Sequence, residues 1–390
     1  MNADERRCAL ALSRMGYHNI TVLRELYNAW GSMADIVKQH AHPEQLAPNM
    51  PERLLAAFAH TDEHLKRADE EMRFAQDNNI SIITLADEAY PQRLKACFDA
   101  PLALFFKGNA NLNAKHCISI VGTRKATPYA ADCIAQLTAR LKQLCPDILI
   151  VSGLAYGVDI MAHRQAIDHA LPTVAVLAHG LDTLYPSRHR KEATLMMQNG
   201  GLLTEYFSQS KIDKRNFLQR NRIVAGMSAA TLLVESAEHG GGLVTCRLAQ
   251  SYQRDVFAIP GNINNPYSVG CNRLIRDNMA GLVTSAEDIL KAMAWEEDMK
   301  ETAATNAVSS NAASSMSPSV LGATSASTAK VPNGAQGVLD VLTKENDLHI
   351  DIIATRAGLP VNKVLALLFQ LEMSGMVSSL SGGRYHKVNS

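Results

Sequence analysis

Residues 117–124 read Cys117-Ile118-Ser119-Ile120-Val121-Gly122-Thr123-Arg124. The first five form a short run that is apolar apart from its serine, and a glycine, a threonine and an arginine follow it. Five similar runs follow, at residues 148–151, 174–177, 201–204, 231–234 and 256–259. Most are near-continuous rather than alternating, which is typical of strands covered on both faces. Stretches of helical length, such as residues 129–144 and 160–170, separate several of these runs. The pattern predicts βαβ units in an α/β core with a mostly parallel sheet.

Three other segments flank this core. Residues 1–75 carry apolar positions at spacings of three and four, which predicts a helical domain before a core of residues 76–295. Residues 296–333 are dominated by Ala, Ser, Thr and Asn, so we expect a flexible linker that cannot bury enough apolar surface to fold. Residues 334–390 show the order helix, turn, helix and small hairpin, which predicts a winged helix-turn-helix.

The composition restricts the classes of function. Lys and Arg number 38, as do Asp and Glu, so a nucleic-acid binder of this composition must concentrate positive charge locally. The seven cysteines lack the short spacing of a zinc knuckle, which predicts buried thiols in a reducing compartment and no metal site. We recognise no signal peptide and no run long enough to span a bilayer, and expect a cytoplasmic protein without membrane contact.

Small residues follow the ends of most predicted strands. In an open parallel sheet, ligands bind outside the carboxyl ends of the strands, where free backbone amides hold anions. We therefore expect an anion or nucleotide site there, although the same glycines could simply terminate tight turns. No Gly-x-Gly-x-x-Gly or Walker lysine pattern is present, so we expect no cofactor. The candidate residues are Gly122, Thr123, Arg124, Ser152, Gly153, Gly240, Gly241 and Gly242.

A basic segment covers residues 211–222, with five cations, one acid and one aromatic residue. Cations along a backbone-tracking surface, with a ring for base stacking, are the ingredients of single-strand binding. The alternative is a solvated loop whose ring packs into the core, but the position just before a Gly-rich strand end favours binding. The candidates are Lys214, Arg215, Phe217, Arg220 and Arg222.

Catalytic patterns are poor in this sequence. No histidine pairs obviously with a nucleophile, and Ser152-Gly153 lacks the elbow spacing of hydrolases. His163, which follows Asp159 on a helical stretch, could be a metal ligand, but we expect a hydrogen-bonded structural residue. We therefore predict a binding protein that is not an enzyme.

An ordered series of motifs runs through the core. They are Ser152-Gly153-Leu154-Ala155-Tyr156-Gly157-Val158-Asp159, Gly180-Leu181-Asp182, Tyr185-Pro186, Arg220-Asn221-Arg222-Ile223-Val224-Ala225-Gly226, Glu235, Pro260-Gly261-Asn262 and Gly270-x-Asn272-x-Leu274-Ile275. Together they resemble the DNA-processing protein A family, also called Smf, and the resemblance covers nearly the whole chain.

The resemblance implies an extended Rossmann-like core between an N-terminal helical, SAM-like domain and a C-terminal winged helix. It implies a protein that binds incoming single-stranded DNA, protects it, dimerises through the Rossmann-like domain and loads the RecA recombinase during natural transformation. Arg124 matches a phosphate-binding arginine, Lys214 a DNA-contacting lysine and Phe217 an aromatic residue beside the bases. Gly122 and Ser152-Gly153 match positions where the backbone approaches DNA.

Three positions depart from the family pattern. Tyr156 replaces a lysine of some relatives, Gly240-Gly241-Gly242 replaces Ser-Gly-Ser, and Asn278 replaces a glycine whose left-handed backbone asparagine can also adopt. One alternative is a nucleotide-processing phosphoribohydrolase on a related Rossmann-like fold, but no glutamate follows Thr245 for acid–base work. A second alternative is a transcription factor with the core as its sensor.

Overall fold

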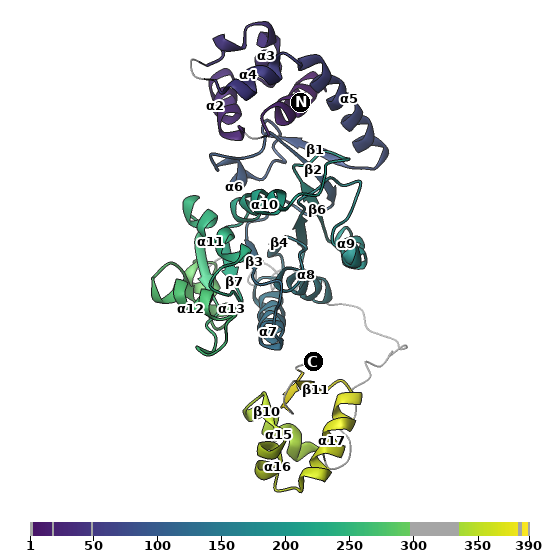
Figure 1. The fold of residues 1–390 in the computed structure, drawn as a ribbon, viewed down its shortest axis with the longest axis vertical. Coiled ribbons are helices and arrows are strands. Elements are labelled where there is room, and N and C mark those ends of the chain that lie inside the picture. The colour runs from purple at the N-terminus through teal and green to yellow at the C-terminus, as the bar shows by residue number, and fades with distance from the viewer. Residues whose placement is uncertain (1–2, 18, 48–49, 297–334, 381–383, 389–390) are drawn as a thin grey trace, which may run out of the picture. The chain divides into compact units, whose positions relative to one another are not determined.

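The structure is a computed structural model that describes residues 3–17, 19–47, 50–296, 335–380 and 384–388 (Figure 1). It divides into two compact units, Met1–Thr302 and Ala303–Ser390. Residues 297–333 of the predicted linker lie outside the described residues. The predicted domain boundaries remain predictions.

The first unit is built on a nine-stranded sheet in the order β1-β2-β6-β5-β4-β3-β7-β8-β9. Every neighbouring pair from β6 to β9 is parallel. Strands β3 to β8 match the six predicted runs to within one residue, which confirms the mostly parallel Rossmann-like core. The strands are β1 (Ser81–Thr84), β2 (Ala103–Gly108), β3 (Cys117–Val121), β4 (Leu149–Ser152), β5 (Thr173–Val176), β6 (Gly200–Thr204), β7 (Ala230–Leu233), β8 (Asp255–Ala258) and β9 (Gly281–Leu282).

Two strands extend the sheet beyond the predicted core. Strand β2 pairs antiparallel with β6, where Phe105 lies opposite Thr204, and β1 pairs antiparallel with β2. The sequence predicts only a connecting stretch here, because each run is short and β6 lies almost a hundred residues further along the chain. Long-range pairing of this kind leaves no local sequence signal.

Helices cover both faces of the sheet. Ile118 and Ile120 of β3 pack in one apolar cluster with Ile134 of α7, whereas Cys117 and Val121 pack on the other face with the buried residues of α11. The two helices that follow the neighbouring strands β3 and β7 therefore lie on opposite faces, which makes this position the topological switch point of the sheet. The first layer contains α7 (Pro128–Leu144), α8 (Val158–Asp168), α9 (Arg190–Met196) and α13 (Ala286–Ala292); the second contains α10 (Lys214–Met227), α11 (Gly241–Ser251) and α12 (Val269–Arg276).

The N-terminal helices gather at the β1–β2 end of the sheet (Figure 1). Leu10, Leu54 and Phe58 belong to the same apolar cluster as Phe105 and Leu203 of the sheet. The helical part therefore shares a core with the Rossmann-like part. The helices are α1 (Ala3–Met15), α2 (Ile20–Trp30), α3 (Met33–Lys38), α4 (Glu52–Phe58), α5 (Thr61–Asp77) and, between β1 and β2, α6 (Gln92–Lys95).

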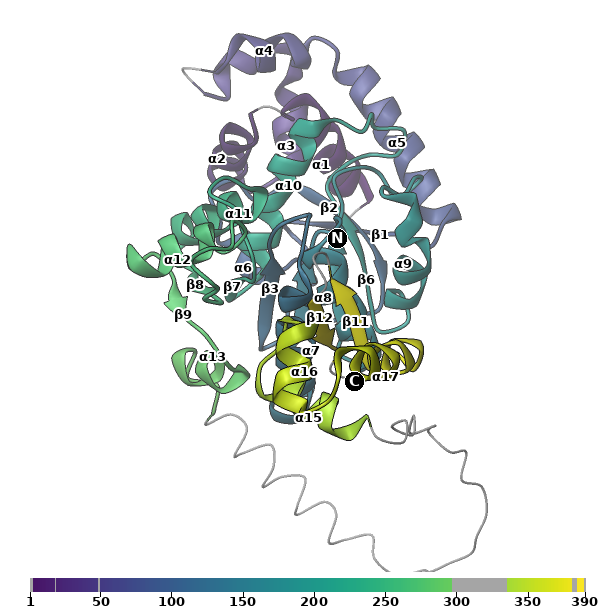
Figure 2. The ribbon, with the colours of Figure 1, turned by 60° about the horizontal axis from the view of Figure 1, so that its bottom comes forward.

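The second unit is a winged helix, as the sequence predicts (Figure 2). Helix α16 ends at Ala357 and is followed by Gly358, whose φ of 65° gives the left-handed backbone that closes a helix without a side-chain clash. Val338, Leu368 and Leu371 are among the buried residues of its core. The elements are α15 (Gln336–Lys344), β10 (Leu348–His349), α16 (Ile350–Ala357), α17 (Val361–Met373), β11 (Val377–Leu380) and β12 (Arg384–Lys387), with sheet order β10-β12-β11.

None of the described helices, taken singly, has the length and apolar composition to cross a bilayer. The pair α16 and α17, bent by 106°, meets those two criteria together.

Candidate nucleic-acid interface

A pocket of about 300 Å³, here named the strand-end pocket, opens at the carboxyl ends of β3, β4 and β7. It therefore lies at the switch point of the sheet, where ligands of open α/β proteins bind. The segments after β5 and β8 do not line the strand-end pocket, although the sequence pattern predicted that they lie on the same edge of the sheet. The lining includes Gly122, Thr123, Arg124, Gly153, Ala155, Asp159, Phe217, Leu218, Arg220, Asn221, Ser236, His239, Gly240, Gly241, Gly242 and Thr245.

Glycines let two strand ends approach each other in this pocket. A Cβ on Gly242 would lie 2.7 Å from Leu233 Cδ1 and 3.2 Å from the Cα of Gly122. A Cβ on Gly122 would in turn lie 2.8 Å from the carbonyl oxygen of Glu235. A side chain on Gly122 would push the ends of β3 and β7 apart, and one on Gly242 would push the start of α11 away from both strands, so close approach, not merely a tight turn, explains the two glycines.

The loop that carries Arg124 is fixed to the end of β7. The Thr123 amide donates to the Glu235 carbonyl oxygen at 2.7 Å. The buried Glu235 carboxylate accepts from the Thr127 amide at 2.9 Å and from its hydroxyl at 2.6 Å. Arg124 is therefore presented on a held loop, which lowers the entropy cost of ordering its side chain on a ligand.

Helix α11 points its N-terminus at the pocket. It begins at Gly241, and its N-cap residue Gly240 supplies no side-chain hydrogen bond. The first amides of a helix have no partner within the helix and carry the positive end of its dipole. The glycine triplet therefore keeps the amides that Ser-Gly-Ser would offer an anion and lacks only the hydroxyls.

Arg220 forms part of the pocket floor. The sequence pattern predicted that Arg220 belongs to a surface of exposed cations. Its guanidinium is instead buried, and Nη1 donates to the carbonyl oxygens of Gly153, at 2.6 Å, and Val176. The Asp159 carboxylate accepts from the amides of Gly153 and Ala155 at 3.2 and 3.4 Å. Burial raises the pKa of Asp159, and the Arg220 charge opposes that rise. Arg220 thus positions the β4 end of the pocket.

The other cations of the basic segment split into two groups. Lys214 and Arg215 are exposed at the start of α10, and the described part of the chain places no carboxylate within ion-pair distance of either. Arg222 instead forms an ion pair with Glu205 and donates to the Asp99 carbonyl oxygen, so the structure does not bring it to the pocket. The reason is helical geometry, because successive side chains point about 100° apart and only part of the segment can face the ligand side.

Ser152 also lies below the pocket rather than in its lining. Its hydroxyl is buried and donates to the Ile120 carbonyl oxygen at 2.6 Å. It therefore joins β4 to β3 beneath the site. His163 is buried with Nδ1 2.8 Å from Thr173 Oγ1, as a structural histidine should be. Asn278 has φ 55°, the left-handed backbone expected of it.

Aromatic rings stand beside the exposed cations. The Arg124 guanidinium carbon lies 5.6 Å from the centroid of the Phe217 ring, within cation–π distance. Tyr185, an exposed residue after β5, meets Phe217 edge-on at 5.7 Å between centroids. The sequence listed Phe217 as a site residue and missed Tyr185. The sequence signals for Tyr185 were its place after a strand end and the Tyr185-Pro186 motif, but neither predicts its tertiary contact with α10.

The described residues contain no group of three or more His, Cys, Asp or Glu side chains that could hold a metal ion. A Rossmann-like sheet whose switch point combines unpaired cations, free helix amides and rings defines a class of proteins that bind nucleotides or nucleic acids. Residues 81–294 match the family of DNA recombination-mediator protein A, and residues 322–383 match the DprA winged helix domain. The chain belongs to the DNA recombination-mediator protein A family, which confirms the resemblance seen in its sequence.

Relatives and solved structures agree with this assignment. Protein Smf of Escherichia coli is 33% identical over 82% of this chain and 80% of its own length. DNA processing protein DprA of Bacillus subtilis is 35% identical over 64% of this chain and 77% of its own length. The structure of DNA processing protein A from Streptococcus pneumoniae has a TM-score of 0.62 at 30% identity, covering 72% of this chain and 95% of that chain. A structure that describes the single-stranded DNA binding mode of the Helicobacter pylori protein has a TM-score of 0.50 at 29% identity, covering 56% and 96%.

Proposed function

We propose that this chain binds single-stranded DNA through the strand-end pocket and the exposed cations at the start of α10. In the cell it protects incoming single strands and loads the RecA recombinase onto them during natural transformation, acting in the cytoplasm as a homodimer. The geometry of the pocket supports the DNA-binding step. Membership of the family, and the Helicobacter pylori structure with its single-stranded DNA binding mode, support the rest.

One observation carries the proposal: Arg124 lies over the Phe217 ring at a pocket that also receives the N-terminus of α11. The cation and the helix amides suit phosphate oxygens, and the ring suits the face of a base. Stacking accepts any base, so binding should be independent of sequence. The exposed charges of Lys214 and Arg215 continue the cationic surface beyond the pocket rim.

The proposal includes the absence of catalysis. Asp159 lines the pocket, and its carboxylate is the group that a hydrolase would use for acid–base work. It instead accepts hydrogen bonds from two backbone amides and lies beside Arg220. After Thr245 the chain continues Cys246-Arg247-Leu248-Ala249, without an acid–base partner. Incubation with nucleoside monophosphates should release no base or ribose 5-phosphate. Turnover that disappears in Asp159→Asn would replace this proposal with an enzyme.

The edge of the sheet supports the homodimer. Strand β9 is an edge strand, and both of its residues are exposed. The segments around it expose the apolar side chains Ile263, Val269, Met279 and Leu282. Exposed apolar side chains near an open strand edge favour a protein–protein contact there. Light scattering should give the mass of a dimer for the wild type and of a monomer for Leu282→Glu.

A titration of labelled single-stranded and duplex oligonucleotides of one sequence, over a salt series, tests the DNA-binding step. Single strands should bind more tightly, with affinity that falls as salt rises because phosphate contacts release counterions. Equal affinity for both forms at matched salt would contradict the proposal. RecA loading is tested on strands coated with single-strand-binding protein, where the wild type should restore RecA's ATPase activity and Arg124→Ala should not.

A further inference from the structure

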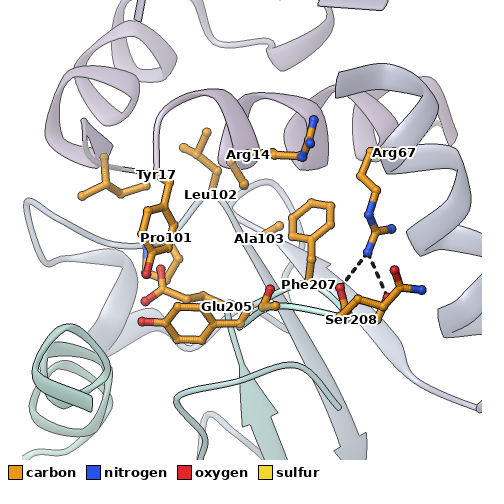
Figure 3. Close-up of a pocket in the computed structure, with 14 residues that line it drawn as sticks. Arg14, Tyr17, Arg67, Pro101, Leu102, Ala103, Glu205, Phe207 and Ser208 are labelled. Atoms are coloured by element: carbon orange, nitrogen blue, oxygen red, sulfur yellow. Dashed lines mark hydrogen bonds between the residues drawn. The ribbon is translucent and has the colours of Figure 1, made fainter. Parts of the chain in front are cut away.

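A second pocket, of about 340 Å³, lies between the N-terminal helices and the segment that follows β6 (Figure 3). We name it the helix-side pocket. Helix α1 and the turn after it form one wall, α5 contributes Arg67, and residues 205–210 form the opposite wall. The helix-side pocket shares no lining residue with the strand-end pocket. The side chains that the argument uses are Arg14, Tyr17, Arg67, Glu205, Phe207 and Ser208.

Rings and guanidinium groups meet in this pocket. The Arg67 guanidinium carbon lies 5.4 Å from the centroid of the Phe207 ring, and Nη2 donates to the Ser208 carbonyl oxygen at 2.8 Å. Figure 3 shows the Phe207 ring rising from the lower wall between Arg67 and the Tyr17 side of the pocket. This is the same combination of cation and aromatic face that Arg124 and Phe217 form in the strand-end pocket. The lining therefore suits a base together with a phosphate.

Among these groups, Arg14 carries the uncompensated charge. Arg67 is paired with Glu71 at 2.8 Å, and the Glu205 carboxylate is paired with Arg222. Arg14 is exposed, and its Nη1 lies 2.9 Å from Nδ1 of His64. Burial and the Arg14 charge lower the pKa of His64, so that histidine is neutral at pH 7. In the described ranges no carboxylate neutralises Arg14, which leaves its charge for an anion.

The two pockets share one stretch of chain. Ser210 lines the helix-side pocket, and seven positions later Phe217 lines the strand-end pocket. Four extended residues span at most about 14 Å and three helical residues about 4.5 Å, so these two residues lie within about 19 Å of each other. Lys211, Lys214 and Arg215 are exposed along that stretch. The Tyr17 hydroxyl also contacts α10, through Asn216 Oδ1 at 2.8 Å and Gln219 Oε1 at 2.7 Å.

We propose that the helix-side pocket takes a further nucleotide of the single strand that occupies the strand-end pocket. The base lies on the Phe207 side, Arg14 neutralises its phosphate, and the strand crosses the exposed cations of residues 211–215 between the two pockets. This inference rests on the proposed single-strand binding and extends it to the N-terminal helices. Both pockets together then set the number of nucleotides that one chain covers, within the roughly 4–16 nucleotides typical of single-strand-binding folds.

The test compares Arg14→Ala with the wild type on oligothymidylates of two lengths, about 5 and about 20 nucleotides, the shorter near the lower limit of such footprints. Arg53→Ala is the matched control, because Arg53 is exposed on α4 and lines neither pocket. The long strand should bind Arg14→Ala at least about threefold more weakly at low salt, and the short strand should bind it as the wild type. Because a phosphate contact on a single strand contributes about 0.7 to the salt slope, the ratio of the two Kd values should fall by about threefold between about 50 and 200 mM salt.

Photocrosslinking of the wild-type chain gives a second readout that needs no variant. A long strand with 5-iodouracil at successive positions should crosslink to the peptide containing Phe207 from positions a few nucleotides away from those that reach Phe217.

If the wild type binds and Arg124→Ala weakens binding, but Arg14→Ala matches Arg53→Ala at both lengths, the helix-side pocket does not contact the strand and the proposed function stands. Saturable binding of thymidine monophosphate that Arg14→Ala abolishes, without a length effect on DNA, would also overturn the proposal, since it would assign the pocket to a free nucleotide. If the wild type binds no single strand, the proposed function itself fails.

Discussion

The strand-end pocket and the winged helix both belong to architectures that bind nucleic acid, yet one exposes cations and the other exposes apolar side chains. The pocket has an exposed arginine over a ring and two more exposed cations at the start of α10. Helix α17, the recognition helix by its place in the order of elements, instead exposes Leu365 by 51%, Phe369 by 63% and Met373 by 75%. From this comparison we expect unpaired charge, rather than the type of motif, to indicate where this neutral chain binds DNA.

The charges of the winged helix explain the contrast. Five basic residues in residues 334–387 face five acidic ones, so the domain has no net field to attract phosphates. Arg356 is paired with Glu345 at 2.5 Å, and His386 Nδ1 lies 2.7 Å from Asp347. Helix α17 carries only Lys363 and Glu372 as charges. Its exposed apolar side chains offer base edges no hydrogen bonds, and they suit contact with another protein.

The largest expected effect is that of removing the ring. Phe217→Ala should weaken single-strand binding by roughly 1–3 kcal/mol for each base stacked, or about 5- to 150-fold, with little change in salt slope. The measurement is fluorescence anisotropy over a salt series. Phe98→Ala is the control, because Phe98 is exposed and packs on Tyr252 away from the pocket. Equal effects of the two substitutions would remove the ring from the site.

The next effect is that of removing one phosphate contact. Arg124→Ala and Lys214→Ala should each lower the salt slope of single-strand binding by about 0.7, since each cation neutralises one phosphate of the strand. Lys214→Ala leaves the helix cap in place, in which Asp213 accepts from the Arg215 amide at 2.7 Å.

Arg53→Ala and Lys191→Ala, on the exposed surfaces of α4 and α9, provide the matched controls for these two variants. Wild-type affinity and slope in Arg124→Ala would show that the groove runs elsewhere on the molecule.

A smaller effect is expected from removing the winged helix. A chain that ends at Glu296 keeps the whole sheet and the buried Trp295, and so retains the first compact unit almost entirely. Its single-strand affinity should fall by less than about tenfold, or 1.4 kcal/mol, because the domain adds no net positive charge. A folded truncation that loses more would make the winged helix a DNA reader and erase the contrast between the two regions.

The smallest effect is expected on the exposed face of α17. Phe369→Ser changes a side chain that packs little, so unfolding should shift by no more than about 0.5 kcal/mol and single-strand affinity should not change. Circular dichroism and the same anisotropy titration measure both quantities. Weaker DNA binding by Phe369→Ser would indicate that this apolar face, and not only charge, contributes to the interface.

Much of the fold was predictable because its signals are local. The six runs of residues 117–259 fixed strands β3 to β8, and the glycines after them located the edge on which the site lies. Strands β1 and β2 could not be found this way, because their place depends on pairing with β6. The same limit applied to Tyr185, which joins the site only through its contact with Phe217.

The sequence by itself determined which segments are candidates for a binding site: strand ends with glycines, and a basic segment with one aromatic residue. The tertiary structure alone decided what each cation of that segment does. Arg220 donates to the carbonyl oxygen of Gly153, Arg222 pairs with Glu205, and Lys214 is left exposed. A cation's partner lies wherever the fold brings it, here 67 residues away for Arg220, whereas sequence periodicity reports only neighbours within a few turns of the same element.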